Sequence, residues 1–177
     1  LKELNPDFCS VTYGAGGSTR DKTLEIVERI QNEFEIPTMA HLTCVCSTRE
    51  QIGEVLDDAG SRGIRNILAL RGDAPDGGEW KATEGGFEYS GELIEFIKER
   101  DAFSIGCAGF PEGHIASENK LTDWGYLKGK FDSGAAFALS QLFFDYADFF
   151  EFTDDMREEL SVPALTISLL YTSYAAA

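Results

Sequence analysis

The feature that most constrains this chain is a regular alternation of short apolar runs with longer amphipathic segments along its length. The apolar runs recur at intervals of roughly 25 to 40 residues, the length of one strand–helix unit. Each run is continuously apolar, as expected for a parallel strand covered on both faces. The pattern predicts an α/β fold on a parallel sheet. The predicted strands span residues 8–13, 39–45, 66–70, 103–109, 137–143 and 162–167.

Between these runs, apolar residues recur at helical spacing. Ser18 and Ser47 each begin a stretch that resembles a capping box, and Gly60 and Gly63 are expected to end the second helix. Ser90 precedes the third helix. We expect the aromatic stripes of the last two helices to face the core and the acidic run 151–159 to be a solvated helix face. The two stripes are Leu121, Trp124, Leu127 and Phe131, and then Phe149, Phe150, Met156 and Leu160.

Six strands with five intervening helices match most of a (β/α)8 TIM barrel, or an open doubly wound sheet. An open sheet normally carries G-x-G-x-x-G after its first strand, whereas here the glycines at 14, 16 and 17 lack that spacing. Polar residues instead follow several different strands, which is how a barrel builds a site. The sequence therefore favours an incomplete barrel. These polar residues are Thr12, His41, Arg71, Asp73, Glu112, His114 and Gln141.

Composition excludes several classes of protein. A length of 177 residues suggests one domain. The net charge of −16 argues against nucleic-acid binding, and a mean hydropathy of −0.18 argues against a membrane protein. The four cysteines are expected to be buried, reduced thiols of a cytoplasmic protein. We expect no metal site, because Cys44 and Cys46 have no second pair and the chain has only two histidines.

The segment Arg71-Gly72-Asp73 ends a predicted strand and offers a cation and a carboxylate beside a glycine that lets the backbone approach a ligand. An ion pair on a surface loop is the alternative. His114 follows another strand and can donate to a phosphate or a ring carbonyl, or can simply be exposed. His41 is equally open to a structural interpretation, as a core histidine bonded to a backbone carbonyl.

Lys128 and Lys130 suit an anionic ligand such as a diphosphate, or alternatively the carboxyl end of a helix. The Gln141 amide suits the edge of a heteroaromatic ring. From the residues alone, the chain is interpreted as a barrel enzyme for an anionic, ring-containing ligand, with its chemistry open.

Five collinear motifs narrow this interpretation. They are SVTYGA at 10–15, HLTC at 41–44, LRGD at 70–73, PEGH at 111–114 and SQLFFD at 140–145. In order and spacing, from residue 7 to about 167, they resemble the 5,10-methylenetetrahydrofolate reductase family. The resemblance is to the bacterial, flavin-dependent type, a (β/α)8 barrel of one-carbon metabolism and methionine biosynthesis.

The resemblance implies a ping-pong reaction in the cytoplasm. NADH or NADPH passes hydride to FAD and leaves, and 5,10-methylenetetrahydrofolate then takes the hydride to become 5-methyltetrahydrofolate. It also implies a homo-oligomer at full length. Asp73 is the implied catalytic residue, tuning the flavin and the folate iminium, while Thr12, Asp73 and Gln141 bind substrate. The implied FAD-binding residues are Thr12, Tyr13, Ala15, His41, Arg71, Gly72, Asp73, Tyr89, Ser90, Phe110, His114, Ser117, Asp123, Tyr126 and Lys130.

The chain also departs from the family pattern. Phe110 replaces a usual Tyr, Ile115 a Pro, and Tyr126 an Asn. The strand bearing the general-acid glutamate has no counterpart upstream of Leu1, and the late seventh and eighth strands are missing. We expect residues 1–167 to be a partial reductase barrel and 168–177 a non-family tail of sequencing-adapter origin.

On this expectation the 177-residue chain itself is inactive, since a general acid contributes about 10² to 10⁴-fold. The alternatives are a non-catalytic flavin-binding fragment, or another TIM-barrel enzyme that binds a phosphorylated ligand.

Overall fold

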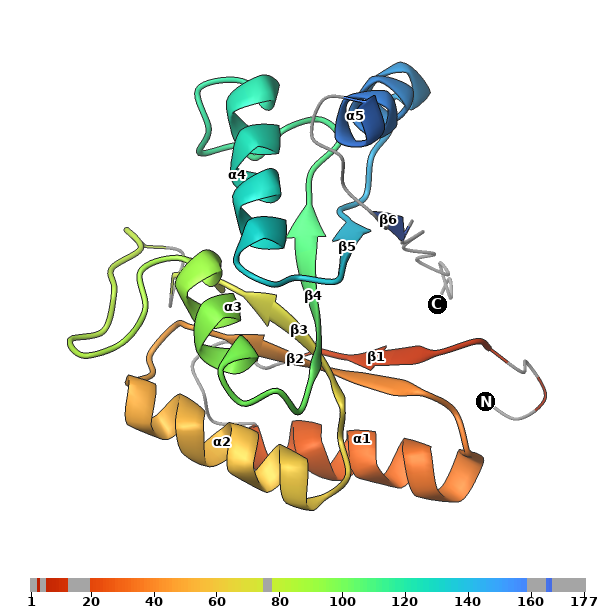
Figure 1. Ribbon diagram of the computed structural model, residues 1–177, viewed down its shortest axis with the longest axis vertical. Coiled ribbons are helices and arrows are strands. Elements are labelled where there is room, and N and C mark those ends of the chain that lie inside the picture. Colours follow the sequence, from red (N-terminus) through yellow and green to blue (C-terminus); the bar gives the residue numbers. More distant parts are fainter. Residues whose placement is uncertain (1–2, 4–5, 13–19, 75–77, 159–164, 167–177) are drawn as a thin grey trace, which may run out of the picture.

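The computed structural model describes residues 3, 6–12, 20–74, 78–158 and 165–166. Within them, six parallel strands alternate with five helices (Figure 1). The strands are β1 (Cys9–Val11), β2 (Thr38–Thr43), β3 (Asn66–Leu70), β4 (Ser104–Gly109), β5 (Phe137–Ser140) and β6 (Leu165–Thr166). The helices are α1 (Arg20–Phe34), α2 (Arg49–Ser61), α3 (Ser90–Lys98), α4 (Lys120–Asp132) and α5 (Tyr146–Glu158).

The strand order decides between the two architectures that the sequence left open. Each strand pairs in parallel with the next one along the chain, from β1 to β6, without a reversal of order. A doubly wound sheet reverses its strand order at a switch point, whereas a barrel does not. The strands also turn progressively, from β1, horizontal in Figure 1, to β4, vertical. The sheet is therefore an arc of a (β/α) barrel, as predicted.

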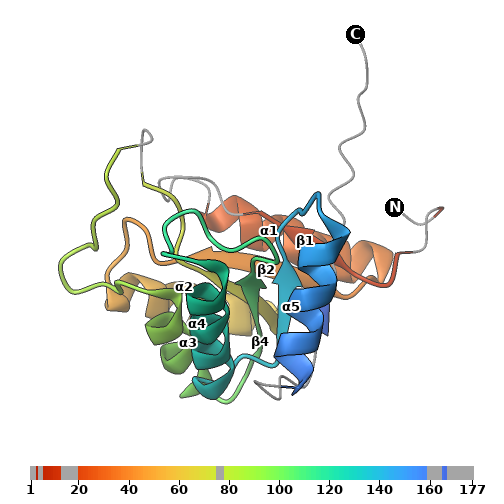
Figure 2. The same ribbon diagram turned by 90° about the horizontal axis from the view of Figure 1, so that it is seen from above.

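The two faces of this arc have different partners. The helices lie along its outer side (Figure 2), where Leu42, Ile67, Ile105 and Cys107 of the strands join the main apolar core. A smaller cluster on the inner side contains Met39, Leu68 and Leu139, with Leu70 and Phe137 packed against it. Because side chains alternate along a strand, the residues two apart from these, such as His41 and Thr43 after Met39, share the inner face.

Helix boundaries differ in detail from the sequence prediction. The capping box of α2 uses Thr48 and Gln51, whose side chains each bond the backbone N–H of the other, and not the predicted box beginning at Ser47. Gly60 lies inside α2, and Gly63, with φ +74°, follows its end. Ser90 is the first residue of α3. The predicted box at Ser18 lies outside the described residues.

The aromatic stripes are only partly correct. Trp124 and Leu127 of α4 are buried, but Leu121 is 60% exposed. On α5, Phe149 and Met156 are buried as predicted, whereas Phe150 is 61% exposed and Phe152 fills the core instead. Phe152 packs against Trp124, with ring centroids 5.4 Å apart. In both helices the buried face is rotated from the predicted one, and this contact joins them.

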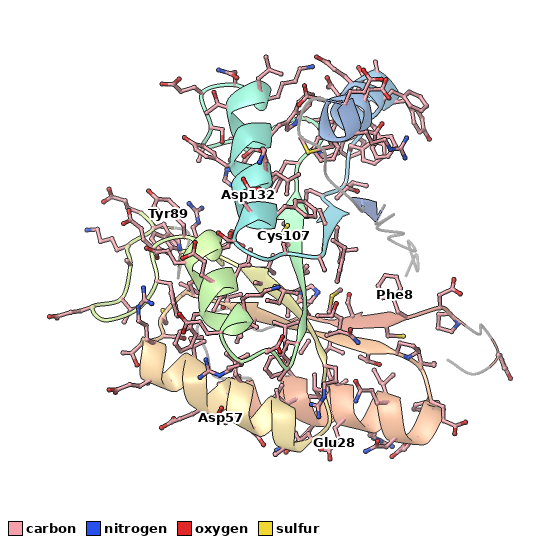
Figure 3. All side chains as sticks on the ribbon, viewed as in Figure 1. Phe8, Glu28, Asp57, Tyr89, Cys107 and Asp132 are labelled. Atoms are coloured by element: carbon pink, nitrogen blue, oxygen red, sulfur yellow. The ribbon has the colours of Figure 1, made fainter. Side chains whose placement is uncertain are left out.

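The strands are shorter than predicted, because their apolar runs continue past the sheet. Val45 is buried beyond the end of β2, and Phe143 packs on Phe149 beyond the end of β5. The cysteine prediction holds for Cys44 and Cys107, the latter deep on β4 (Figure 3), but it was wrong for Cys46, which is exposed in the turn after β2.

Candidate functional site

A cleft of about 820 Å³ opens between α3, α4 and the segment that follows β4. Its walls come from parts of the chain that are far apart in sequence, and they include Arg71 from the carboxyl end of β3. Nine of the residues implied by the family resemblance line it. They are Arg71, Tyr89, Ser90, Phe110, His114, Ser117, Asp123, Tyr126 and Lys130.

Lys130 projects from α4 toward the strand beneath it. Its Nζ donates to the carbonyl oxygen of Ala108 on β4 at 3.0 Å and lies 6.0 Å from the centroid of the Phe110 ring. Burial lowers the pKa of this ammonium below its ordinary value. The alternative of a lysine that only satisfies a helix terminus does not describe this geometry. Lys128, in contrast, pairs with Asp132 on its own helix at 2.6 Å.

The segment after β4 is anchored by α4. The buried Trp124 indole N–H donates to the carbonyl oxygen of Phe110 at 3.1 Å. The Phe110 ring meets His114 edge-on at 4.8 Å between centroids, and His114 Nδ1 accepts the Ala116 backbone N–H at 3.1 Å. His114 is thus half-buried and held with Nδ1 engaged, which leaves Nε2 as its outward-acting nitrogen.

Three carboxylates also line the cleft, and each already has a donor. Asp123 accepts the Ser117 hydroxyl at 3.0 Å, and Glu95 accepts the Ser133 hydroxyl at 3.0 Å. Glu92 accepts the backbone N–H of Glu88 at 2.7 Å, at the start of α3. These bonds draw the carboxylates toward the walls of the cleft, so that Arg71 and Lys130 supply its cationic character.

Tyr89 and Ser90 stand where α3 begins. Tyr89 is exposed at the rim (Figure 3), and the hydrogen bond and charge of the adjacent Glu88 carboxylate raise the pKa of its phenol. Ser90 is buried at the first turn of the helix. Tyr126 is exposed on α4, on the other wall of the cleft.

Arg71, Gly72 and Asp73 form a strand-end turn. The Arg71 guanidinium stacks over the Trp80 ring, 5.1 Å from its centroid, and no ion pair between Arg71 and Asp73 occurs in the part of the chain described. Gly72 has φ +83°, and a Cβ there would lie 2.8 Å from Val45 Cγ1. Glycine is therefore required at this turn for both conformation and space. Asp73 is exposed beside the cleft-lining Arg71.

The inner face of the barrel arc carries two polar atoms without partners. His41 Nε2 and Thr43 Oγ1, on one face of β2, are buried and make no hydrogen bond. Burial lowers the pKa of His41, which favours the neutral imidazole. The alternative of a histidine bonded through Nε2 to a backbone carbonyl is thereby excluded. The Trp80 indole N–H is likewise buried and unbonded. Sequence reasoning missed Thr43 and Trp80, since neither belongs to a polar cluster in the sequence.

The remaining predicted residues do not line this cleft. Thr12 is exposed just after β1, and its carbonyl oxygen accepts the Thr23 hydroxyl at 3.2 Å. Gln141 is exposed at the end of β5, and its backbone N–H donates to the Gly109 carbonyl at 2.7 Å. Both lie at carboxyl ends of strands, on the same edge of the sheet as Arg71. Tyr13 and Ala15 lie outside the described residues.

Two searches of the described residues bear on other classes of site. No group of three or more His, Cys, Asp or Glu side chains there is arranged to hold a metal ion. Among the helices described, none has the length and apolar character needed to span a bilayer.

Comparison with known proteins places the chain among its relatives. A family model described as methylenetetrahydrofolate reductase matches residues 1–177. The chain is 42% identical to methylenetetrahydrofolate reductase (NADH) 1 of Arabidopsis thaliana, covering 89% of this chain and 29% of that protein. It is 39% identical to 5,10-methylenetetrahydrofolate reductase of Pectobacterium carotovorum subsp. carotovorum, covering 87% of this chain and 50% of that protein. The chain thus spans half or less of the length of these relatives.

Solved structures of low identity share the fold. A 2,3-dimethylmalate lyase of the PEP mutase/isocitrate lyase superfamily aligns with a TM-score of 0.64 at 9% identity, covering 96% of this chain and 60% of that one. A monomeric dihydrodipicolinate synthase variant aligns at 0.58 and 14% identity, covering 94% and 53%. At these identities the likeness concerns the backbone alone. The family match and the curated relatives go further: the chain belongs to the methylenetetrahydrofolate reductase family.

Proposed function

We propose that the whole protein reduces 5,10-methylenetetrahydrofolate to 5-methyltetrahydrofolate, with hydride from NADH or NADPH passing through FAD held in the cleft between α3 and α4. The supporting observation is that one cleft is lined by nine residues that the family resemblance implies as FAD contacts. Because the chain spans half or less of its relatives, the activity is proposed for the whole protein.

The chemistry of the residues present suits an extended ligand with a diphosphate centre and aromatic ends. Arg71 and Lys130 provide two cations in a chain whose net charge is −16, and His114 adds an imidazole nitrogen. Tyr89 and Tyr126 offer aromatic faces on opposite walls. The unpartnered His41 Nε2 and Thr43 Oγ1 are polar atoms that a ring edge with donors and acceptors would satisfy. These residues therefore fit FAD.

FAD, when bound, supplies the two-electron chemistry of the reaction. The chain's own residues bind and orient it. In the proposal, Lys130 and His114 hold the diphosphate, Arg71 orients the bound group while its guanidinium rests on Trp80, and Gly72 lets the backbone approach. Asp73 places a negative charge beside the site, where it favours the cationic iminium form of the folate. Thr12 and Gln141 contact the nicotinamide and the folate in turn.

The names of the plant relatives favour NADH as the donor. The proteins of Arabidopsis thaliana and Zea mays are both named for NADH, and they are 42% and 44% identical to this chain. We propose NADH as the preferred donor and the cytoplasm as the site of the reaction, within one-carbon metabolism and the supply of methyl groups to methionine.

The experiment separates the two half-reactions. The whole protein, loaded with FAD, is mixed anaerobically with NADH, and the visible flavin absorbance is followed; 5,10-methylenetetrahydrofolate is then added. The proposal predicts bleaching by NADH, faster than by NADPH, and return of the absorbance with formation of 5-methyltetrahydrofolate. Bleaching without return would remove the folate from the proposal. A folded protein that takes up no FAD would favour the flavin-free alternative, a barrel enzyme for another phosphorylated ligand.

A further inference from the structure

Glu112 links two loops at the carboxyl edge of the sheet. It lies in the segment after β4, and its Oε1 accepts the backbone N–H of Phe144 at 2.6 Å and that of Asp145 at 3.1 Å. The donors are 32 and 33 residues further along the chain, immediately before α5. One carboxylate oxygen thus holds two consecutive N–H groups. Hydrogen bonds to an ionised acceptor are stronger than neutral ones.

The other end of that loop is held by the same segment. The loop runs from Gln141 to Asp145, and the Gln141 backbone N–H donates to the Gly109 carbonyl at 2.7 Å, at the end of β4. Gly109 and Glu112 together fix both ends of a five-residue connection. Beyond Glu112, the same segment continues into His114 and Ser117, which line the cleft.

The loop has a further support that does not depend on Glu112. The ring of Phe143 stacks on that of Phe149 of α5, with centroids 4.5 Å apart and planes 9° apart. Asp145 Oδ1 accepts the Ala147 N–H at 2.7 Å, which caps the helix. Removing the Glu112 carboxylate therefore leaves α5 packed and capped. What is lost is the connection between the loop of Gln141 and the cleft segment.

We propose that Glu112 is a positioning residue for Gln141. It holds the loop after β5 against the segment after β4, so that the Gln141 amide stands at a fixed distance from the cleft. The inference rests on the proposed function, in which Gln141 contacts folate and nicotinamide. Glu112 itself is exposed and does not line the cleft, so its substitution acts through the loop.

The test uses three variants of the whole protein. Glu112→Ala removes the acceptor, whereas Glu112→Gln keeps an amide oxygen in its place. Glu118→Ala is the matched control, because Glu118 is an exposed carboxylate of the same connection before α4. Three quantities are measured: amide hydrogen exchange at Gln141, Phe144 and Asp145, the KM values against kcat, and the dissociation constant of FAD.

We expect Glu112→Ala to accelerate exchange at the three amides and to raise the KM for the folate by about 3- to 10-fold, the loss expected for hydrogen bonds to a charged group at an exposed site. FAD affinity should change by less than about 2-fold, since no cleft residue is altered. Glu112→Gln should restore most of the KM and the protection, and Glu118→Ala should match wild type.

Two results would overturn the inference. One is a Glu112→Ala protein whose exchange and KM equal those of Glu118→Ala. The other is a loss of FAD affinity as large as the change in KM, which would make Glu112 a support of the cleft and not of Gln141. A wild-type protein without turnover would instead reject the proposed function, and the exchange rates at Gln141 would still decide whether Glu112 holds its loop.

Discussion

The Lys130 ammonium lies 3.0 Å from the carbonyl oxygen of Ala108, so that a cation from α4 rests directly on the backbone of β4. Its burial at the floor of the cleft lowers its pKa, which means that the folded protein bears a cost for the charge when the cleft holds no anion. A bound diphosphate would offset that cost. The position of Lys130 thus connects the fold of α4 with the proposed ligand.

Replacing Lys130 with Met should weaken FAD binding by about 10- to 100-fold, the range expected for a charge-assisted hydrogen bond to phosphate. The apo-protein should keep its stability, because a buried charge is replaced by an apolar chain of similar length. Titration of flavin fluorescence measures the affinity. Lys128→Met is the matched control on the same helix, since Lys128 pairs with Asp132 outside the cleft lining. Equal affinities of the two variants would contradict the role of Lys130.

The turn at Gly72 offers a comparison between strain and contact. Gly72→Ala should destabilise the protein by about 2 to 4 kcal/mol, since it adds steric overlap to an unfavourable φ. Gly63→Ala should cost about 1 kcal/mol, because Gly63 also has a positive φ but open space around its Cβ position. Urea unfolding of both variants provides the measurement. A Gly72 variant no less stable than the Gly63 variant would show that Val45 does not confine the turn.

The buried His41 predicts a pH dependence of stability. Its pKa in the folded state is below the ordinary value of 6.5, so the unfolded state takes up a proton first as the pH falls. The free energy of unfolding should therefore decrease as the pH falls through about 6.5, until His41 is protonated in the folded state as well. His41→Gln should remove part of this slope, whereas His114→Gln should retain it. Chemical unfolding between pH 5 and 8 tests the prediction, and an unchanged slope in His41→Gln would refute it.

The thiols should react in an order set by burial. Burial raises the pKa of Cys44 to about 12 and that of Cys107 to about 11, while Cys46 is exposed. In the native protein at pH 8, a thiol reagent should modify Cys46 rapidly and the two buried thiols only after unfolding. Cys46→Ser should abolish the fast phase. Fast modification of Cys44 or Cys107 in the folded protein would contradict the burial of these thiols.

The same two thiols predict a loss of stability in alkali. Because their folded pKa values are raised, the unfolded state loses its protons first as the pH rises through about 8.5, the ordinary value for a cysteine. The free energy of unfolding should therefore decrease above that pH. Cys107→Ala should reduce this decrease, measured by chemical unfolding at pH 8 and pH 10.

The period of the apolar runs was sufficient to predict the six strands and the five helices, because a buried parallel strand needs apolar residues on both faces. It was insufficient for the rotation of α4 and α5. Both helices carry apolar residues around much of their circumference, so Leu121 and Phe150 were assigned to the core, while Phe152 was overlooked. The pairing with β4 and the contact between Trp124 and Phe152 decide which residues are buried, and a sequence pattern does not contain that contact.

The candidate site was predicted unevenly. The residues that line the cleft came from the resemblance to a known family, whereas the spacing alone left Lys130 and His114 with structural alternatives. Contacts between distant segments were beyond reach: the Arg71–Trp80 stack crosses a loop without periodicity, and the Glu112 bonds span more than thirty residues. The exposure of Cys46 was missed because the apolar run of β2 continues into the turn.

The measurement that tests the central claim most directly is the visible absorption spectrum of the 177-residue chain after addition of FAD and desalting, with circular dichroism on the same sample. The account predicts a folded α/β protein that retains the flavin spectrum, and a Lys130→Met variant that loses most of it on the column. A folded wild-type chain that elutes without flavin would contradict the assignment of the cleft between α3 and α4 to FAD.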